Sequence, residues 1–377
     1  MFRVFRYRLY PTAAQQERLE AVLETCRRFY NDCLEERKAT YEEEGRTIGK
    51  VEQLRRVKIH KANNPYAATV HSHVLQVVVT DLDKAFRAFF RRVKAGEKPG
   101  YPRFKGQHRF HSFGFKEEGN GFKIDGRRLR LSGIGRVAVR WHRPLEGTIK
   151  TLRITRKADK WYAAFSCAVE SRPLPSSDQE VGIDTGLSSL FVLSTGEHID
   201  NPRWYRSSQR KLRVLQRAVA RKRKGSMNRR KAVSALARFS EHVANQRKDF
   251  LNKLVSTLVG AFGRIAVEDL LVSRMVHGNL AKSILDAGWG FFKQRLLAKA
   301  ESAGRVVALV DPAYTTQNCC QCGHRQKLSL KDRWYSCPCG NSRHRDENAA
   351  LNILAAGRAV WAPSLALAGL AQEAVPL

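Results

Sequence analysis

Three acidic residues stand at positions that favour metal-dependent phosphodiester chemistry. Asp184 and Glu268 each end an apolar stretch, in Val-Gly-Ile-Asp-Thr-Gly-Leu and Ile-Ala-Val-Glu-Asp-Leu, and Asp346 lies in Arg-His-Arg-Asp-Glu-Asn-Ala-Ala. Carboxylates at the ends of neighbouring strands can converge on one point. Such a point suits Mg²⁺, which prefers oxygen ligands, and a two-metal site supports in-line displacement at phosphorus. A lone acid after an apolar strand is more often a turn or cap residue, so the prediction rests on the ordered set of three.

Another acidic residue, Asp269, directly follows Glu268. Neighbouring side chains of a strand face opposite sides, so only one of these two can point at the site if both lie on a strand. The interpretation assigns Glu268 to the metal site, together with Asp184 and Asp346.

Five of the eight cysteines crowd between the second and third acids, and they favour a structural zinc site over disulfides. Cys319 and Cys322 have the CxxC spacing of a zinc knuckle, and Cys337 and Cys339 form a shorter CxC pair. Four thiolates satisfy tetrahedral Zn²⁺, so these four are the predicted ligands. The alternatives are a ribbon that binds metal poorly, or a replacement of one ligand by His324, His344 or Cys320. Metal binding without a secretion signal predicts a reducing, cytoplasmic location.

The net charge of the chain indicates a polyanionic partner. Its 377 residues carry 68 Lys and Arg against 35 Asp and Glu, a formal net charge of +33. Self-repulsion on this scale opposes compaction, and binding of nucleic acid offsets it. A charged surface kept for solubility needs far less charge. An anionic membrane surface is the other option, but no stretch is typical of a spanning helix or a signal peptide.

Two basic stretches are candidate nucleic-acid contacts. The loop at residues 98–105 places Tyr101 beside Arg103 and Lys105, so bases could stack on the ring while the cations pair with phosphates. The alternative is a basic surface loop with anchoring aromatic side chains. The stretch 203–248 suggests a wall that tracks phosphates, although most charge runs are only solvated helix faces. Its densest cluster consists of Arg221, Lys222, Arg223 and Lys224.

Periodicity predicts two structural halves. Residues 2–10 alternate like a half-buried strand, Thr12 and Gln15 form a capping-box signal, and most of 12–92 is helical. Short strands follow at 129–131, 137–139, 152–154 and 161–168, which suggests a small barrel or sandwich that the first strand completes. Beyond a Pro- and Ser-rich linker, strands at the first two acids and at 306–310 alternate with helices, as in an α/β layer fold.

Several segments together resemble the TnpB (OrfB) proteins of bacterial insertion sequences, compact relatives of type V CRISPR effectors. The resemblance covers about residues 3–356. It is carried, in order, by Tyr-Arg-Leu-Tyr-Pro-Thr-Ala-Ala-Gln near the start, Asp-Lys-Ala-Phe-Arg-Ala-Phe-Phe, Gly-Tyr-Pro-Arg-Phe-Lys, Gly-Ile-Asp-Thr-Gly-Leu, Val-Glu-Asp-Leu, Tyr-Thr-Thr-Gln-Asn-Cys and Arg-Asp-Glu-Asn-Ala-Ala.

The resemblance implies an α/β RNase H-like (RuvC) nuclease domain with an inserted zinc ribbon, after an N-terminal wedge β-barrel with an inserted helical recognition domain. The implied boundaries are 1–11 and 116–172 for the barrel, 12–115 for the recognition domain, 173–179 for a linker, 180–314 and 344–358 for the nuclease domain, 315–343 for the ribbon and 359–377 for a flexible tail.

The resemblance also implies an activity. Members of the family bind a guide RNA from the element's own end, recognise a target-adjacent motif, and cut DNA that pairs with the guide, in the bacterial cytoplasm at the nucleoid. Asp184, Glu268 and Asp346 match the family's metal-binding triad, and Gln76 matches a helix that reads the adjacent motif, where Gln can pair with adenine.

Two departures from the family pattern, and three rival functions, accompany this interpretation. The chain has Cys-Pro-Cys where the family usually has a CPxC pair, and His344 where an acid usually stands. The rivals are an RNA-guided DNA-binding repressor without cleavage, a transposase, and an RNA-binding accessory factor.

Overall fold

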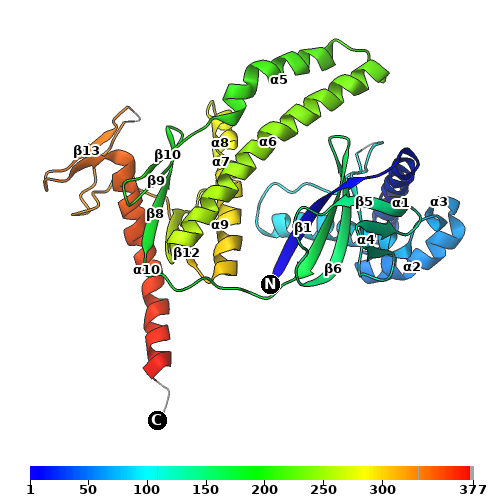
Figure 1. Cartoon of the computed structure of the whole chain (residues 1–377), viewed down its shortest axis with the longest axis horizontal. Coiled ribbons are helices and arrows are strands. Elements are labelled where there is room, and N and C mark those ends of the chain that lie inside the picture. Colours follow the sequence, from blue (N-terminus) through cyan, green and yellow to red (C-terminus); the bar gives the residue numbers. More distant parts are fainter. Residues whose placement is uncertain (108, 330, 374–377) are drawn as a thin grey trace. The chain divides into compact units, whose positions relative to one another are not determined.

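The computed structural model describes residues 1–107, 109–329 and 331–373 (Figure 1). The chain forms two compact units, Met1–Glu170 and Ser171–Leu377. Among the described residues, no helix is both long and apolar enough to cross a bilayer.

The first unit combines one antiparallel sheet with a helical insertion. Its elements are β1 (Phe2–Tyr10), α1 (Ala13–Glu44), α2 (Lys50–Asn63), α3 (Pro65–Ala68), α4 (Ser72–Lys94), β2 (Ser112–Phe115), β3 (Phe122–Asp125), β4 (Arg128–Leu131), β5 (Gly135–Arg140), β6 (Thr148–Lys157) and β7 (Lys160–Ala168). The four helices follow β1 directly, as the sequence predicts. The predicted capping box at the start of α1 is confirmed, since Thr12 and Gln15 exchange side-chain and backbone hydrogen bonds.

The seven strands are ordered β2-β6-β7-β1-β5-β4-β3, so the first strand lies at the centre of the sheet. The hydrogen-bonded order does not join β2 to β3, but the rings of Phe115 and Phe122 from these end strands pack with centroids 5.9 Å apart. A ring contact thus links the two end strands of the sheet, where the hydrogen-bonded order has no backbone ladder. β2 begins at residue 112, four residues before the boundary expected for the barrel.

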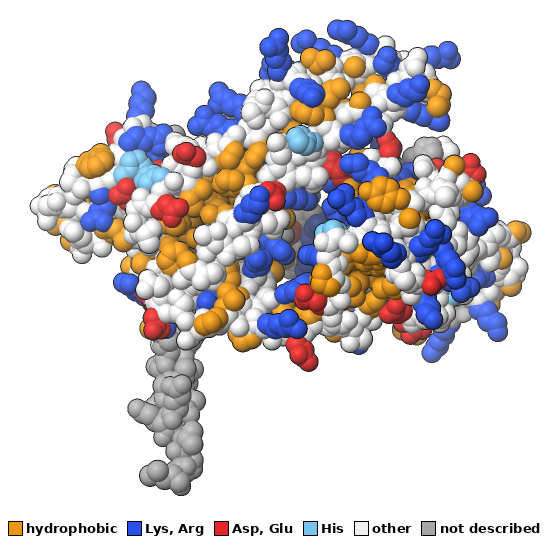
Figure 2. All heavy atoms as spheres, viewed as in Figure 1, with side chains coloured by type: hydrophobic (Ala, Val, Ile, Leu, Met, Phe, Trp, Pro, Cys, Tyr) orange, Lys and Arg blue, Asp and Glu red, His pale blue; other side chains and the backbone are white. Residues whose placement is uncertain are grey.

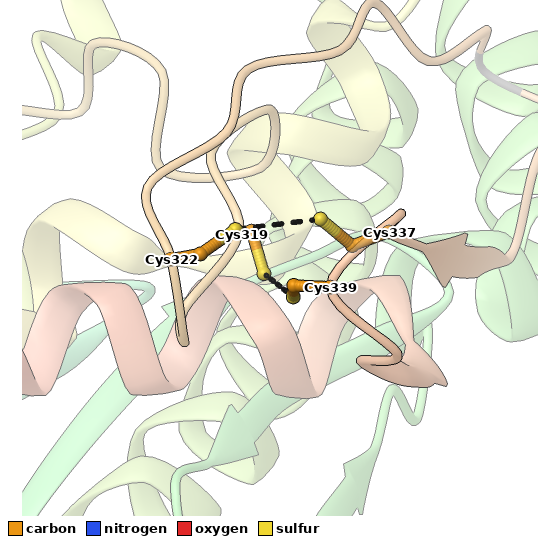
Figure 3. Close-up of side chains that lie close together, drawn as sticks. All are labelled: Cys319, Cys322, Cys337 and Cys339. Carbon is orange, nitrogen blue, oxygen red and sulfur yellow. Dashed lines mark hydrogen bonds between the residues drawn. The ribbon is translucent and has the colours of Figure 1, made fainter.

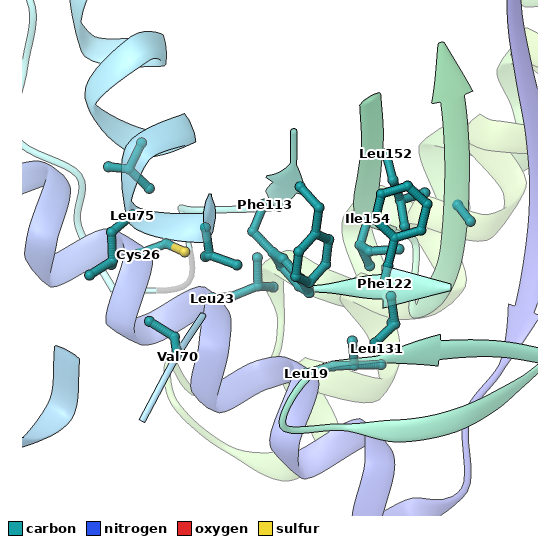
Figure 4. Close-up of a cluster of buried hydrophobic side chains, with 14 of the residues drawn as sticks. Leu19, Leu23, Cys26, Val70, Leu75, Phe113, Phe122, Leu131, Leu152 and Ile154 are labelled. Atoms are coloured by element: carbon teal, nitrogen blue, oxygen red, sulfur yellow. The ribbon is translucent and has the colours of Figure 1, made fainter. Parts of the chain in front are cut away.

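A hydrophobic core joins the helical insertion to the sheet. On α1, Leu19, Leu23 and Cys26 face strand residues such as Phe113 and Leu131 (Figure 4). All five side chains are almost completely buried, and burial of a side chain of this size contributes about 1.5–3 kcal/mol. The shared core explains why a helical segment so early in the chain packs on strands that come a hundred residues later.

The second unit is an α/β layer structure with a small appended hairpin. Its elements are β8 (Glu180–Thr185), β9 (Ser189–Leu193), β10 (His198–Asp200), α5 (Trp204–Ala220), α6 (Met227–Ala261), β11 (Arg264–Glu268), α7 (Val272–Met275), α8 (Ala281–Ala287), α9 (Trp289–Ala303), β12 (Val306–Val310), β13 (Trp334–Ser336), β14 (Ser342–His344) and α10 (Arg345–Glu373). Its main sheet has the order β10-β9-β8-β11-β12.

The three strands predicted to alternate with helices, β8, β11 and β12, run parallel at the centre and one edge of this sheet. One face packs against α6 and α9 through a core that includes Ile183, Val267 and Phe292. The other face packs against α10 through Ala266, Ile353 and their neighbours. Both faces are covered, which is why these strands read as continuous apolar runs.

α10 extends to Glu373, over most of the segment expected as a flexible tail. The remainder of that segment, residues 374–377, lies outside the described residues.

Candidate nuclease centre

The register of two parallel strands places the first two acids side by side. Ile183 on β8 pairs with Val267 on β11, so the next residues, Asp184 and Glu268, meet at the same edge of the sheet. Both side chains lie on the face that α10 covers, because they are two residues beyond Gly182 and Ala266, which pack against that helix.

α10 brings in the third acid. Asp346 lies in its first turn, and the helix comes exceptionally close to β8 at Gly182. A Cβ atom at Gly182 would stand 2.1 Å from the carbonyl oxygen of Ala350. Gly357 makes a second close approach, because its Cβ would stand 2.4 Å from the Cβ of Ala266. These two glycines let the helix lie on the strands, which sets the depth at which Asp346 meets the other acids.

The three carboxylates line one cavity of about 280 Å³, here called the acidic cavity. Asp184, Glu268 and Asp346 are 5 %, 7 % and 7 % exposed. Burial raises the pKa of Asp184 well above its ordinary value, and the negative charges of Glu268 and Asp346 raise it further. Such a cluster holds its negative charge at a cost that a bound cation would offset.

The two adjacent acids, Glu268 and Asp269, have different surroundings. The carboxylate of Glu268 accepts a hydrogen bond of 2.7 Å from the hydroxyl of Thr315. Burial raises the pKa of Glu268, and this hydrogen bond opposes the rise. Asp269 points away and forms an ion pair of 2.6 Å with Lys293. β11 ends at Glu268, so Asp269 lies just beyond the strand, and only Glu268 of the two lines the acidic cavity.

Basic side chains lie at the same cavity. Arg333 and Arg345 contribute to its lining, and Nε of Arg345 lies 3.4 Å from a carboxylate oxygen of Asp346. His344, the residue that departs from the family pattern, accepts the backbone N–H of Asp346 on Nδ1 at 3.3 Å. Its ring packs edge-on against His198, so this histidine caps the start of α10.

Four cysteines form a second cluster in the segment between β12 and α10 (Figure 3). The Sγ atoms of Cys319 and Cys339 are 3.7 Å apart, and those of Cys322 and Cys337 are 3.5 Å apart. Zn–S bonds of 2.3 Å in a tetrahedron require sulfurs about 3.8 Å apart. All four sulfurs lie within 4.8 Å of one another, so the predicted set fits structural Zn²⁺.

The short CxC pair still forms a knuckle because a tight turn closes it. Gly340 has φ +92° and donates its N–H to the carbonyl of Cys337 at 3.0 Å. Gly323 closes the CxxC pair in the same way on the carbonyl of Cys319. Burial opposes ionisation of Cys319, but hydrogen bonds from the backbone of Cys322 and Gln321 and from Asn341 lower its pKa to about 6. A thiol that ionises easily is a good metal ligand.

The alternative ligands do not join this cluster. Within the described part of the chain, the group of four comprises cysteines alone, without His324 or His344. The sulfur of Cys320 instead faces the amide of Asn341 at 3.7 Å.

The residues of the 98–105 loop are anchored as well as exposed. Tyr101 is 46 % exposed, and its ring packs edge-on against Phe86 and Phe89. Lys105 lies over the ring of Tyr30, and its backbone is held by Asn31. Arg103 is exposed. Tyr101 is thus anchored on Phe86 and Phe89 and remains open to solvent over part of its side chain.

The other predicted contacts lie on two helical segments. Gln76 is half-buried on α4. The exposed residues Arg221, Lys222, Arg223 and Lys224 form the turn between α5 and α6. These two helices pack as a hairpin, in which Lys211 lies over the ring of Phe239, and Figure 2 shows basic side chains gathered over its far end. The four cations therefore lie together at the end of a packed helical hairpin.

Three residues of the centre were not singled out from the sequence. Thr315 orients Glu268, Gly182 admits α10, and Arg333 lines the cavity. Gly182 and Thr315 lie in the segments that carry the family resemblance, which was the available signal. No local pattern indicates Arg333, because it directly precedes β13 and reaches the site only through the tertiary fold.

Known protein families match most of this chain. A family described as "Probable transposase" (OrfB of IS605) matches residues 164–278, a Cas12f1-like TNB domain matches 289–353, and a helix-turn-helix domain of the same OrfB group matches 1–46. In the structure, that last segment consists of β1 and the long helix α1.

Full-length relatives agree with these matches. A protein of Streptomyces pristinaespiralis named "Putative RNA-guided DNA endonuclease" is 35 % identical over 369 residues, covering 96 % of this chain and 90 % of that protein. InsQ of Escherichia coli K12, which bears the same description, is 30 % identical and covers 95 % and 93 %.

The fold also has a solved counterpart. Cas12f1, in a complex with single-guide RNA and target DNA, superposes with a TM-score of 0.59 at 12 % identity, covering 94 % of this chain and 98 % of that one. The full-length identity to the Streptomyces and Escherichia proteins, together with the family matches, establishes that the chain belongs to the TnpB (OrfB) family.

Proposed function

We propose that this protein is an RNA-guided, Mg²⁺-dependent DNA endonuclease encoded with a bacterial insertion sequence. The observation that carries the proposal is the convergence of three buried acids from β8, β11 and α10 on one cavity. The names of the full-length relatives support the same activity.

The two units take different parts in this activity. The second unit, with parallel strands covered on both faces, acts as a RuvC-like nuclease domain, and its cysteine hairpin acts as a zinc ribbon. The first unit acts as the wedge, with α1 to α4 forming the recognition domain. The fold shared with Cas12f1 supports this assignment.

The donor set of the acidic cavity fits Mg²⁺. Asp184, Glu268 and Asp346 offer hard oxygen ligands, and their mutual repulsion favours a cation between them. When bound, two such ions would supply Lewis-acid catalysis to in-line hydrolysis of a phosphodiester.

The residues of the chain hold and orient the reactants around this point. The hydroxyl of Thr315 fixes the carboxylate of Glu268. Arg333 and Arg345 place positive charge at the same cavity, where it can hold the non-bridging oxygens of the scissile phosphate.

Nucleic acid is held through its backbone, and sequence is read by base pairing. A guide RNA from the element's own end pairs with the target strand, and the basic surface binds the heteroduplex by its shape and phosphates. The contacts we assign to this surface are Tyr101, Arg103, Lys105 and the cations 221–224, and we assign Gln76 to the target-adjacent motif.

A guided-cleavage assay tests the proposal. The protein is purified from cells that co-express its flanking locus, its RNA is sequenced, and the complex is mixed with a plasmid that matches the RNA's 3′ segment beside randomised flanks. We expect linearisation that requires Mg²⁺ and one class of flank, loss of cutting in Asp184→Ala, and retained cutting in Asp269→Ala.

Two outcomes would overturn the proposal. Bound RNA with an intact plasmid would indicate a DNA-binding repressor that does not cleave. Purification without a discrete RNA would remove the guided mechanism altogether.

A further inference from the structure

A second cavity adjoins the acidic cavity within the second unit. It has a volume of about 380 Å³ and lies between the start of α5 and the segment around α8. Leu187 and Ser188, in the loop between β8 and β9, line both cavities. The loop that follows Asp184 therefore forms part of the wall of both cavities.

Uncompensated positive charge lines this basic cavity. Arg203, Arg206 and Lys282 contribute to its wall, and their side chains are exposed. Within the described part of the chain, none of these three side chains has a hydrogen bond or an ion pair. The one acid in the lining, Asp286, is 5 % exposed and is already paired with Arg247.

The fold holds the cations in place through Asp286. Its carboxylate accepts the backbone N–H of Tyr205 at 2.7 Å, which ties the first turn of α5 to α8. Trp204 is buried against Phe250 beside it. Arg203, the N-cap of α5, adopts left-handed backbone angles of φ +48° and ψ +52°. Such strain at a non-glycine residue persists only where the surroundings enforce it, and it is concentrated at functional sites.

An aromatic ring completes the cavity. Tyr205 is half-buried and contributes to the wall, as the two arginines do. Its ring makes no ring or cation contact with the described residues. Bases of single strands stack on such rings while basic groups hold the phosphates.

We infer that the basic cavity is a nucleotide subsite for the single DNA strand that is being cut. Arg203, Arg206 and Lys282 bind phosphates next to the scissile one, and Tyr205 stacks on a base. The volume lies in the range of about 300–1,000 Å³ typical of small-ligand pockets, which suits one nucleotide and not a duplex. The inference rests on the proposed function, because it seats the substrate of that reaction.

Binding of a short single strand tests the inference without any cleavage. The probe is fluorescein-labelled dT12, and the protein is the RNA-loaded Asp184→Asn variant, measured by anisotropy from 50 to 200 mM KCl. Adding Arg203→Gln and Arg206→Gln should weaken binding at least tenfold. It should also flatten the log–log salt dependence by about 0.7 for each phosphate that the protein no longer neutralises.

A matched pair controls for charge. Arg210→Gln with Arg213→Gln removes the same charge from exposed positions of the same helix, outside the cavity lining. This pair should change the affinity less than threefold. Equal weakening by both pairs would overturn the inference.

Photo-crosslinking locates the probe. With one 5-iododeoxyuridine in dT12, we expect a crosslink to Tyr205 that is lost in Tyr205→Leu. A crosslink confined to another part of the chain would overturn the inference even if dT12 binds. The proposed function fails separately, as absence of Mg²⁺-dependent cutting by the wild type, and these binding and crosslinking results do not depend on that cutting.

Discussion

At the scale of single residues, the centre gathers like charges at a cost to the fold. Asp184 is buried beside two other acids, whereas Asp269, one residue from Glu268, is about half exposed and paired with Lys293. The charges of Asp184 and Asp269 thus have different effects on stability, because one is buried among like charges and the other is paired with a cation.

This difference predicts opposite effects of two conservative substitutions on stability. The folded-state pKa of Asp184 lies above its ordinary value of 3.8, so the folded protein binds more protons than the unfolded chain above that pH. The contribution of Asp184 to stability is therefore most favourable below about pH 4, becomes unfavourable as the pH rises through the raised pKa, and stays so beyond it. Asp184→Asn removes the charge and should raise the Tm in EDTA at pH 7.5 by at least about 2 °C, the shift that 1 kcal/mol produces in a domain of this size.

Differential scanning fluorimetry checks this, with Asp269→Asn as the control. That variant loses an ion pair and should leave the Tm unchanged or slightly lower. Adding 10 mM Mg²⁺ should raise the Tm of the wild type and of Asp269→Asn, and raise that of Asp184→Asn much less, because binding to the folded state alone is stabilising. Equal Mg²⁺ shifts in all three proteins would argue against metal binding at Asp184.

At the scale of elements, the centre depends on how closely α10 lies on the sheet. Gly182 has ordinary backbone angles, so its role is not conformational freedom but the space left by its missing side chain. The helix backbone occupies that space. Asp184 near the end of β8 can meet Asp346 at the start of α10 because the two backbones come close together at Gly182.

Gly182→Ala should therefore destabilise the second unit and misplace Asp346. A Cβ 2.1 Å from the carbonyl oxygen of Ala350 forces the helix outward, and overpacking of this kind costs about 1–3 kcal/mol. We expect a lower Tm and a loss of guided cleavage of at least tenfold. Chemical denaturation with a cleavage assay on the same preparation measures both.

Gly260→Ala provides the comparison. Gly260 lies near the end of α6, where an added Cβ would meet no atom within 4 Å, so alanine there should be neutral or stabilising by up to about 1 kcal/mol. If Gly182→Ala behaves like Gly260→Ala, the close packing of α10 does not set the geometry of the centre.

Sequence patterns reveal features that are local in the chain and miss contacts between distant segments. Strand periodicity and the ends of apolar runs located Asp184 and Glu268, and cysteine spacing located the four clustered cysteines, because these signals are local. The parallel order β8-β11-β12 and the contact of Gly182 with Ala350 join segments far apart in the chain, so no local window contains them. β2 escaped prediction because Ser-Phe-Gly-Phe is short and includes a glycine.

At the scale of the whole molecule, the charge of +33 gives salt two opposing effects. In the free protein, salt screens repulsion among cations and favours the folded state. In the RNA-loaded protein, the cations are paired with phosphates, and salt weakens those pairs because the release of counterions on binding then yields less free energy.

The sign of the salt dependence should therefore report whether RNA is bound. Between 50 and 300 mM KCl, we expect the Tm of ribonuclease-treated protein to rise and that of the RNA-loaded complex to fall. Both samples come from one preparation, so they differ only in the RNA. A Tm that moves in the same direction in both would mean that the basic surface is neutralised within the protein itself, and the case for a polyanionic partner from net charge would be lost.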